Sequence, residues 1–240
     1  MRASPEPMFF SLSDSLDLPV FFKENNLSFS LKAEPPKKQI IRCYDTFDWR
    51  GWNKKCALII SRRKLILLDL DSGNELCSVP LGKTPQRFFP KDIAEAETAS
   101  RLQNLSKLRA FIHFGSVETE SRTWRVLDEN RKTVASLTLL SILPSKEQKT
   151  PEFRCYARLT PVRGYPKELE NLAASLRTSP EYSQEGTFRS VYTSILETLG
   201  IVPACYSSKP YVKLKPDNSI QDSARELLLS TLEVIRANES

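Results

Sequence analysis

Hydrophobic and polar residues alternate through several short segments of this chain. Residues 27–32 change from apolar to polar at every step, which is the period of two expected for a strand with two different faces. We therefore expect an apolar face made of Leu27, Phe29 and Leu31 and a polar face made of Ser28, Ser30 and Lys32.

Further apolar or alternating segments predict strands at residues 39–45, 57–61, 64–69, 75–79, 108–114, 122–127, 133–140 and 153–160. Turn-forming residues separate several of them, as in Asp71-Ser72-Gly73-Asn74. Apolar residues spaced by three and four predict helices at 92–105, 166–177 and 188–199. A last helix is predicted after Ser219, which precedes Asp222 at capping-box spacing and leads into an apolar stripe of Ile220, Ala224, Leu227, Leu228, Leu232 and Ile235.

These elements predict an α+β fold with an antiparallel sheet and with inserted and C-terminal helices. A sheet of eight strands that curls into a barrel or tunnel would also pair its edges. We expect four regions along the chain: an N-terminal extension at 1–26, where the aromatic residues keep no period, a main domain at 27–178, a helical extension or linker at 179–212, and a C-terminal helix at 213–240.

Composition narrows the classes of function. The 240 residues carry a net charge of +6, which favours anionic partners without choosing among them. A single histidine and seven glycines, none of them in a phosphate-binding loop, exclude H-E-x-x-H metalloproteases, P-loop proteins and dinucleotide-binding motifs. Five cysteines without C-x-x-C spacing argue against a disulfide framework and favour a reducing, cytoplasmic location. No segment approaches the roughly 18 apolar residues of a membrane span, and we expect no membrane partner.

A set of motifs resembles the CYTH superfamily, the triphosphate-tunnel fold of thiamine triphosphatases and class IV adenylate cyclases. The resemblance is strongest to the CYTH-like half of proteins that also carry a CHAD domain, and it covers about residues 27–176. The C-terminal stripe looks like the opening helix of a CHAD domain. The motifs are Tyr44-Asp45-Thr46-Phe47-Asp48-Trp49-Arg50, Ala57-Leu58, residues 65–70 and 88–93, Leu108-Arg109-Ala110, Arg122-Thr123-Trp124-Arg125-Val126-Leu127-Asp128 and Pro161-Val162-Arg163-Gly164-Tyr165.

The resemblance implies a first strand with the motif Glu-x-Glu-x-Lys, whose carboxylates hold a divalent metal. In this chain the three positions are Ser28, Ser30 and Lys32, and a hydroxyl does not replace a carboxylate as a charged ligand for magnesium. We therefore expect no catalytic residues, no metal ligands and no cofactor, with Mg²⁺ or Mn²⁺ needed only if hydrolysis persists. The phosphate-binding candidates are the basic residues Lys32, Arg63, Arg122 and Arg158.

The function implied is a non-catalytic module that binds inorganic polyphosphate or a nucleoside triphosphate, or that serves as a scaffold for a CHAD-domain protein. Self-association through the C-terminal helix is another option, and nucleic acid is not expected. Two alternatives remain: a metal-dependent triphosphatase with an altered metal site, and an inert remnant whose cations pair with carboxylates. Asp45 and Asp48 could form an acid–base pair. Alternatively, Asp48 belongs to a turn and Asp45 hydrogen-bonds the backbone or pairs with Arg50, and His113 is expected to be a packed side chain.

Overall fold

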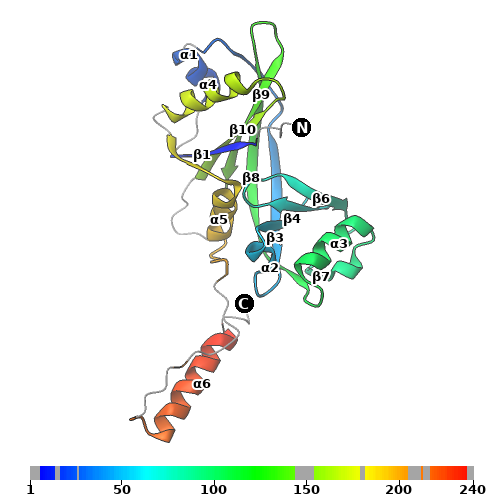
Figure 1. Cartoon of the computed structure of the whole chain (residues 1–240), viewed down its shortest axis with the longest axis vertical. Coiled ribbons are helices and arrows are strands. Elements are labelled where there is room, and N and C mark those ends of the chain that lie inside the picture. Colours follow the sequence, from blue (N-terminus) through cyan, green and yellow to red (C-terminus); the bar gives the residue numbers. More distant parts are fainter. Residues whose placement is uncertain are drawn as a thin grey trace.

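The computed structural model describes residues 6–13, 17–25, 27–143, 154–178, 182–204, 212 and 217–236. Its strands form one antiparallel sheet in the order β11-β1-β10-β9-β8-β3-β4-β5-β6, and β2 and β7 also pair with β8 (Figure 1). The α+β fold class is confirmed. The described strands form an open sheet that ends at β11 and β6, in place of the closed eight-stranded tunnel that we expected.

The strands are β1 (Met8–Leu12), β2 (Ser30–Ala33), β3 (Lys37–Asp45), β4 (Cys56–Ser61), β5 (Lys64–Asp69), β6 (Glu75–Pro80), β7 (Arg87–Phe88), β8 (Phe111–Leu127), β9 (Thr133–Ile142), β10 (Arg154–Pro161) and β11 (Tyr182–Gly186). The helices are α1 (Leu18–Glu24), α2 (Arg50–Asn53), the 3₁₀ turn η1 (Pro90–Asp92), α3 (Ala96–Leu105), α4 (Pro166–Arg177), α5 (Phe188–Thr198) and α6 (Ile220–Arg236).

Strand β8 is the centre of the sheet. The two strands predicted at 108–114 and 122–127 are one strand of 17 residues, long enough to pair with β7 and then β9 along one edge and with β3 and then β2 along the other. The polar stretch between the two predicted segments hid this continuity, because apolar periodicity marks a strand only where one of its faces is buried.

The N-terminal segment differs most from its expected structure as a loosely packed extension. Strand β1 lies between β10 and β11 and pairs with both of them. Its residues Phe9, Phe10 and Leu12 are buried, on both faces of the sheet. A strand covered on both sides shows no alternation, which explains why the sequence pattern missed it. Helix α1 follows, with Asp17 accepting a hydrogen bond from the N–H of Val20 at its start.

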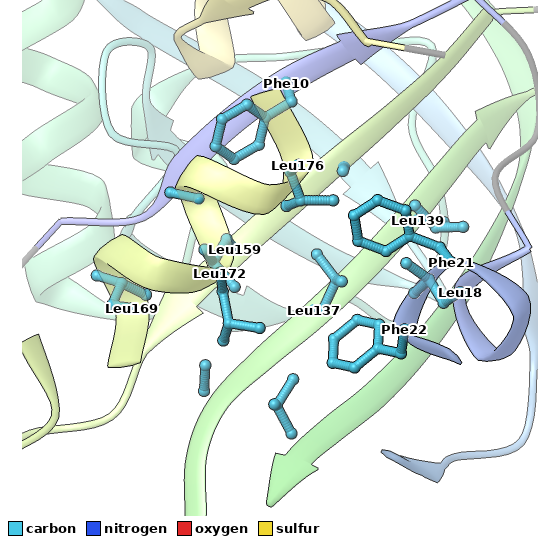
Figure 2. Packing of buried hydrophobic residues seen from close by; sticks show 14 of the residues in the cluster. Phe10, Leu18, Phe21, Phe22, Leu137, Leu139, Leu159, Leu169, Leu172 and Leu176 are labelled. Atoms are coloured by element: carbon cyan, nitrogen blue, oxygen red, sulfur yellow. The ribbon is translucent and has the colours of Figure 1, made fainter. Parts of the chain in front are cut away.

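One face of the sheet packs against α1 and α4, and we call it the α4 face. Figure 2 shows Phe10, Leu137 and Leu159 of the strands beneath the leucines of α4, with the aromatic residues of α1 beside them. The leucines of α4 recur every three or four residues, as predicted, and so line one side of the helix. The buried helical residues are Leu18, Phe21 and Phe22 of α1 and Leu169, Leu172 and Leu176 of α4.

The opposite face packs against α5, and we call it the α5 face. Phe9, Ile41 and Tyr156 from three strands meet the buried residues Val191 and Ile195 of α5. A further cluster lies at the β4–β5 end of the sheet, where α3 covers it with Leu102 and Leu105. Helices therefore cover part of each face and leave other rows of strand residues accessible.

Helix α6 begins where the capping pattern predicted it. The hydroxyl of Ser219 accepts a hydrogen bond from the N–H of Asp222 at 3.1 Å. Several of its apolar side chains, including Leu228 and Leu232, are exposed. Figure 1 shows α6 standing away from the sheet.

Candidate functional site

A row of residues crosses the α5 face at the level of Arg158. Directly opposite residues of antiparallel strands share a face, and Arg158 of β10 is opposite Phe9 of β1 and Thr138 of β9. Thr138 is in turn opposite Thr123 of β8, and the two hydroxyls are 3.0 Å apart. The row therefore presents one guanidinium and two hydroxyl groups side by side.

A second row lies two residues further along the strands, on the same face. Thr160 is opposite Ser136, Ser136 is opposite Arg125, and Arg125 is opposite Lys32 of β2. Arg125 and Lys32 are exposed. They line a surface cavity of about 480 Å³, together with Ser30, Leu127, Arg131 and Thr133.

Arg158 is electrostatically unusual in this arrangement. It is half-buried, and burial lowers its pKa from the ordinary value for arginine. Its Nε is buried and has no hydrogen-bond partner among the described residues, while the guanidinium carbon lies 5.5 Å from the ring centroid of Phe9. A buried donor without an acceptor is costly.

The four phosphate-binding candidates do not converge. Lys32 and Arg158 share the α5 face, but Arg122 points to the α4 face because it is adjacent to Thr123 on β8. Arg122 is 57% exposed and pairs with Glu120 at 2.9 Å. Arg63 occupies the turn between β4 and β5, with a φ of 59°. The four residues therefore do not form one joint site, and only Lys32 and Arg158 among them share a face.

The residue that sequence reasoning missed is Arg125. It belongs to the motif that carried the family resemblance, but its partner Lys32 is more than ninety positions away and only the register of β2 against β8 joins them. Its Nε donates to Glu34 Oε1 at 3.0 Å. Arg125 is exposed and Glu34 half-buried, and an ion pair this accessible contributes little to stability.

One carboxylate lies at these rows: the N–H of Glu34 donates to the carbonyl oxygen of Thr123, and its Oε1 accepts from Arg125. The first strand of the sheet is β1 rather than residues 27–32, and it places Phe9 and Ser11 on the α5 face. Ser30 of β2 is exposed and Ser28 lies before that strand. Across the ranges that the structure describes, no three His, Cys, Asp or Glu side chains lie close enough to hold a metal ion.

The motif that begins at Tyr44 builds a structural corner. Asp45 is buried and accepts hydrogen bonds from the N–H groups of Thr46, Gly51 and Trp52 at 2.7–2.8 Å. Burial raises the pKa of Asp45 to about 6, although these hydrogen bonds oppose the change. The carboxylate ties the end of β3 to the start of α2 and has no access to solvent for acid–base work.

Asp48 organises the other side of the same corner. Its carboxylate accepts from the hydroxyl of Thr46 at 2.8 Å and from Arg50 Nε at 2.9 Å, and it lies 2.7 Å from a terminal nitrogen of Arg109. Burial alone would raise the pKa of Asp48, but the hydrogen bonds from Arg50 and Thr46 and the charge of Arg109 together lower it. The turn interpretation of this residue is therefore the one that the geometry supports.

The other reactive side chains considered in the sequence are packed. The ring of His113 lies 5.3 Å from that of Tyr44, its Nε2 is 2.9 Å from the hydroxyl of Ser116, and burial lowers its pKa. Cys43 is buried, which raises the pKa of its thiol to about 12. Cys205 lies outside the described residues. None of the described helices combines the length and the apolar character that crossing a bilayer demands.

Comparison with known proteins adds little at the level of sequence. No family model and no curated protein matches the chain. Among 22 matching chains of solved structures is a candidate adenylate cyclase from Vibrio parahaemolyticus, with 9% identity and a TM-score of 0.36. The match covers 87% of this chain and 97% of that chain. Similarity at this level transfers neither a fold nor an activity.

Proposed function

We propose that this protein is a non-catalytic module that binds a chain of phosphates, such as inorganic polyphosphate or a nucleoside triphosphate, on the α5 face of its sheet. The observation that supports it is the placement of Arg158, Arg125 and Lys32 in two adjacent rows of one face, with hydroxyl groups between them. Arginine and lysine bind phosphate oxygens through charge-assisted hydrogen bonds.

The spacing of the cations favours an extended anion. Arg158 and Arg125 are two strands and two residues apart, so their Cα atoms are separated by about 12 Å. Both side chains are long enough to reach toward the hydroxyls of Thr138 and Ser136, which lie between them on β9. A single phosphate would contact one end of this arrangement, whereas linked phosphates would contact both.

The binding energy would come from groups that the free protein leaves without partners. Arg158 Nε is a buried donor with no acceptor among the described residues, and a phosphate oxygen would supply one once the side chain turned toward solvent. A new hydrogen bond to an unpaired buried donor contributes more to the binding free energy than a bond that replaces an existing one. The desolvation cost of the donor is already present in the free protein.

The proposal excludes catalysis for a chemical reason. Phosphoanhydride hydrolysis in a metal-dependent enzyme needs a divalent ion between carboxylate ligands and phosphate oxygens. The one carboxylate at the two rows, that of Glu34, pairs with Arg125, and the other groups are arginine, lysine and hydroxyl groups, which repel hard cations or bind them weakly. The triphosphatase alternative would need a metal site built from other residues.

Thermal melting with tripolyphosphate, at low salt and without divalent metal, tests the binding. Ligand that binds only the folded state raises the melting temperature, and we expect a rise for the wild-type chain. Arg158→Ala should abolish most of this rise. Arg122→Ala removes the same charge from the opposite face and should leave it unchanged.

Each melting shift is compared with the ligand-free melting temperature of the same variant, because truncation of a half-buried arginine also changes stability by itself. No rise in the wild-type chain would contradict the proposal and favour an inert scaffold. Equal losses in the two variants would show attraction by net charge alone. Steady phosphate release from tripolyphosphate with Mg²⁺ or Mn²⁺, at low protein concentration, would favour the enzyme.

A further inference from the structure

The turn that joins α3 to β8 presents one large apolar side chain to solvent. Leu108 is 88% exposed, and its neighbours in the chain are the cations Lys107 and Arg109. The leucine that ends α3, Leu105, and the first residue of β8, Phe111, are both buried in the α3 cluster. Between these two buried residues, the side chain of Leu108 is directed outward.

The turn holds this exposure in place through hydrogen bonds. Ser106 is buried, and its hydroxyl accepts from the N–H of Arg109 at 3.1 Å and lies 3.2 Å from the carbonyl oxygen of the same residue. Such a serine-centred turn fixes the backbone on both sides of Leu108. The leucine therefore cannot fold back into the core without loss of these bonds.

Cations surround the exposed leucine. A cavity of about 420 Å³ beside it is lined by Arg50, Lys54, Lys107 and Arg109 with the amide side chains Gln103 and Asn104. An adjoining cavity of about 510 Å³ shares Gln103, Lys107 and Leu108 and adds Lys91 with Phe89 and Pro90. We call these residues together the Leu108 surface. Its lining, as far as the structure describes it, includes no carboxylate, and Asp48 behind it pairs with Arg50 and Arg109.

We propose that the Leu108 surface docks this protein onto an anionic lipid bilayer. Leu108 would enter the boundary between headgroups and acyl chains, and the surrounding lysines and arginines would lie against lipid phosphates and carboxylates. The exposed leucine and the surrounding cations would both contribute to this binding, since apolar insertion and electrostatic attraction together hold peripheral proteins at membranes. The sequence-based expectation of no membrane partner rested on the lack of a spanning segment, which this mode does not require.

A nucleic acid fits the same surface less well. Binding to single strands relies on aromatic faces that are open for base stacking. The aromatic ring that lines this surface, that of Phe89, lies 5.5 Å from Lys91 Nζ, and the nearby ring of Phe47 carries the guanidinium of Arg109 at 4.4 Å from its centroid. The exposed leucine would also have no role against a phosphate backbone.

Vesicle sedimentation of the full chain tests the docking. We expect the wild-type chain to bind vesicles of phosphatidylcholine mixed with phosphatidylserine, to bind pure phosphatidylcholine weakly, and to dissociate as salt rises. Leu108→Ser should weaken binding roughly tenfold, from the lost burial of one leucine. Lys54→Ala with Lys107→Ala should weaken it by about fivefold for each cation removed.

Two matched controls separate this surface from general effects. Val202→Ser removes another exposed apolar side chain, 66% accessible, and Arg122→Ala removes a cation from the α4 face. Both should bind like wild type, and melting temperatures confirm that every variant is folded. No binding to the mixed vesicles, or equal losses in test and control variants, would overturn the proposal. Loss of vesicle binding on Arg158→Ala alone would also overturn it and assign the lipid phosphates to the sheet face.

Discussion

The backbone N–H of Gly51 donates a 2.8 Å hydrogen bond to Oδ1 of Asp45, and a Cβ atom at Gly51 would lie 2.9 Å from Oδ2 of the same carboxylate. Glycine at position 51 therefore leaves the space that the buried carboxylate of Asp45 occupies. This contact explains why the segment after Tyr44 folds into a corner that joins β3 to α2.

Gly51→Ala should therefore destabilise the protein. The added methyl must displace a buried carboxylate that holds three N–H groups, so we expect a loss of roughly 1–3 kcal/mol in the free energy of unfolding. Urea denaturation measures it. Gly82→Ala is the matched control, because a Cβ at Gly82 would meet no atom within 4 Å. Equal effects of the two substitutions would contradict this description of the corner.

The raised pKa of Asp45 predicts a pH dependence of stability. The folded state binds the proton with a pKa of about 6, against an ordinary value of 3.8, so between these values the folded state holds more protons than the unfolded state. Stability should fall as pH rises through this window, by up to about 3 kcal/mol from this group.

The measurement is the difference in unfolding free energy between the wild-type chain and Asp45→Asn, followed from pH 3.8 to about 6. Other carboxylates contribute equally to both chains and cancel. The asparagine should be less stable overall, because its amide turns a donor toward the N–H of Trp52. A difference that stays constant across the window would refute the assignment.

Because β1 is part of the sheet, we expect the N-terminal segment to contribute to the stability of the fold. Phe10 is fully buried on the α4 face, against the residues shown in Figure 2. Phe10→Ala should cost about 3–5 kcal/mol of unfolding free energy. Val20→Ala truncates an exposed apolar residue in the same segment and should cost far less. If both changes were tolerated equally, the segment would be the loose extension that its sequence suggested.

The turn between β4 and β5 offers a stabilising change. Arg62 and Arg63 have φ values of 50° and 59°, a left-handed conformation that suits asparagine and glycine in a two-residue hairpin. Replacement of the pair by Asn-Gly should raise stability by about 1 kcal/mol, measured by thermal melting. The rise in melting temperature with tripolyphosphate should persist, because Arg63 is outside the two rows of the α5 face. If the rise in melting temperature with tripolyphosphate were lost, Arg63 would be shown to contribute to binding.

Elements with one exposed face were predictable from their sequence. Leu27, Phe29 and Leu31 do pack against the core, and Ser28, Ser30 and Lys32 are exposed. Helix α4 has the predicted bounds. In such segments the local pattern records burial directly, because each residue either contacts the core or contacts water.

Elements covered on both faces and contacts between distant strands were not predictable. Strand β1 is apolar on both sides, so its five residues carry no period. The faces of Arg122 and Arg158 follow from the register of β8, β9 and β10, and a shift of one residue would exchange them.

The fold class and most helices were predictable from the sequence, because they depend on local periodicity and residue type. Tertiary contacts were needed to show which cations share a face, that Asp45 is a buried cap, and that Leu108 projects from a hydrogen-bonded turn among cations. These properties depend on strand register and on packing between segments far apart in the chain, which no local pattern encodes.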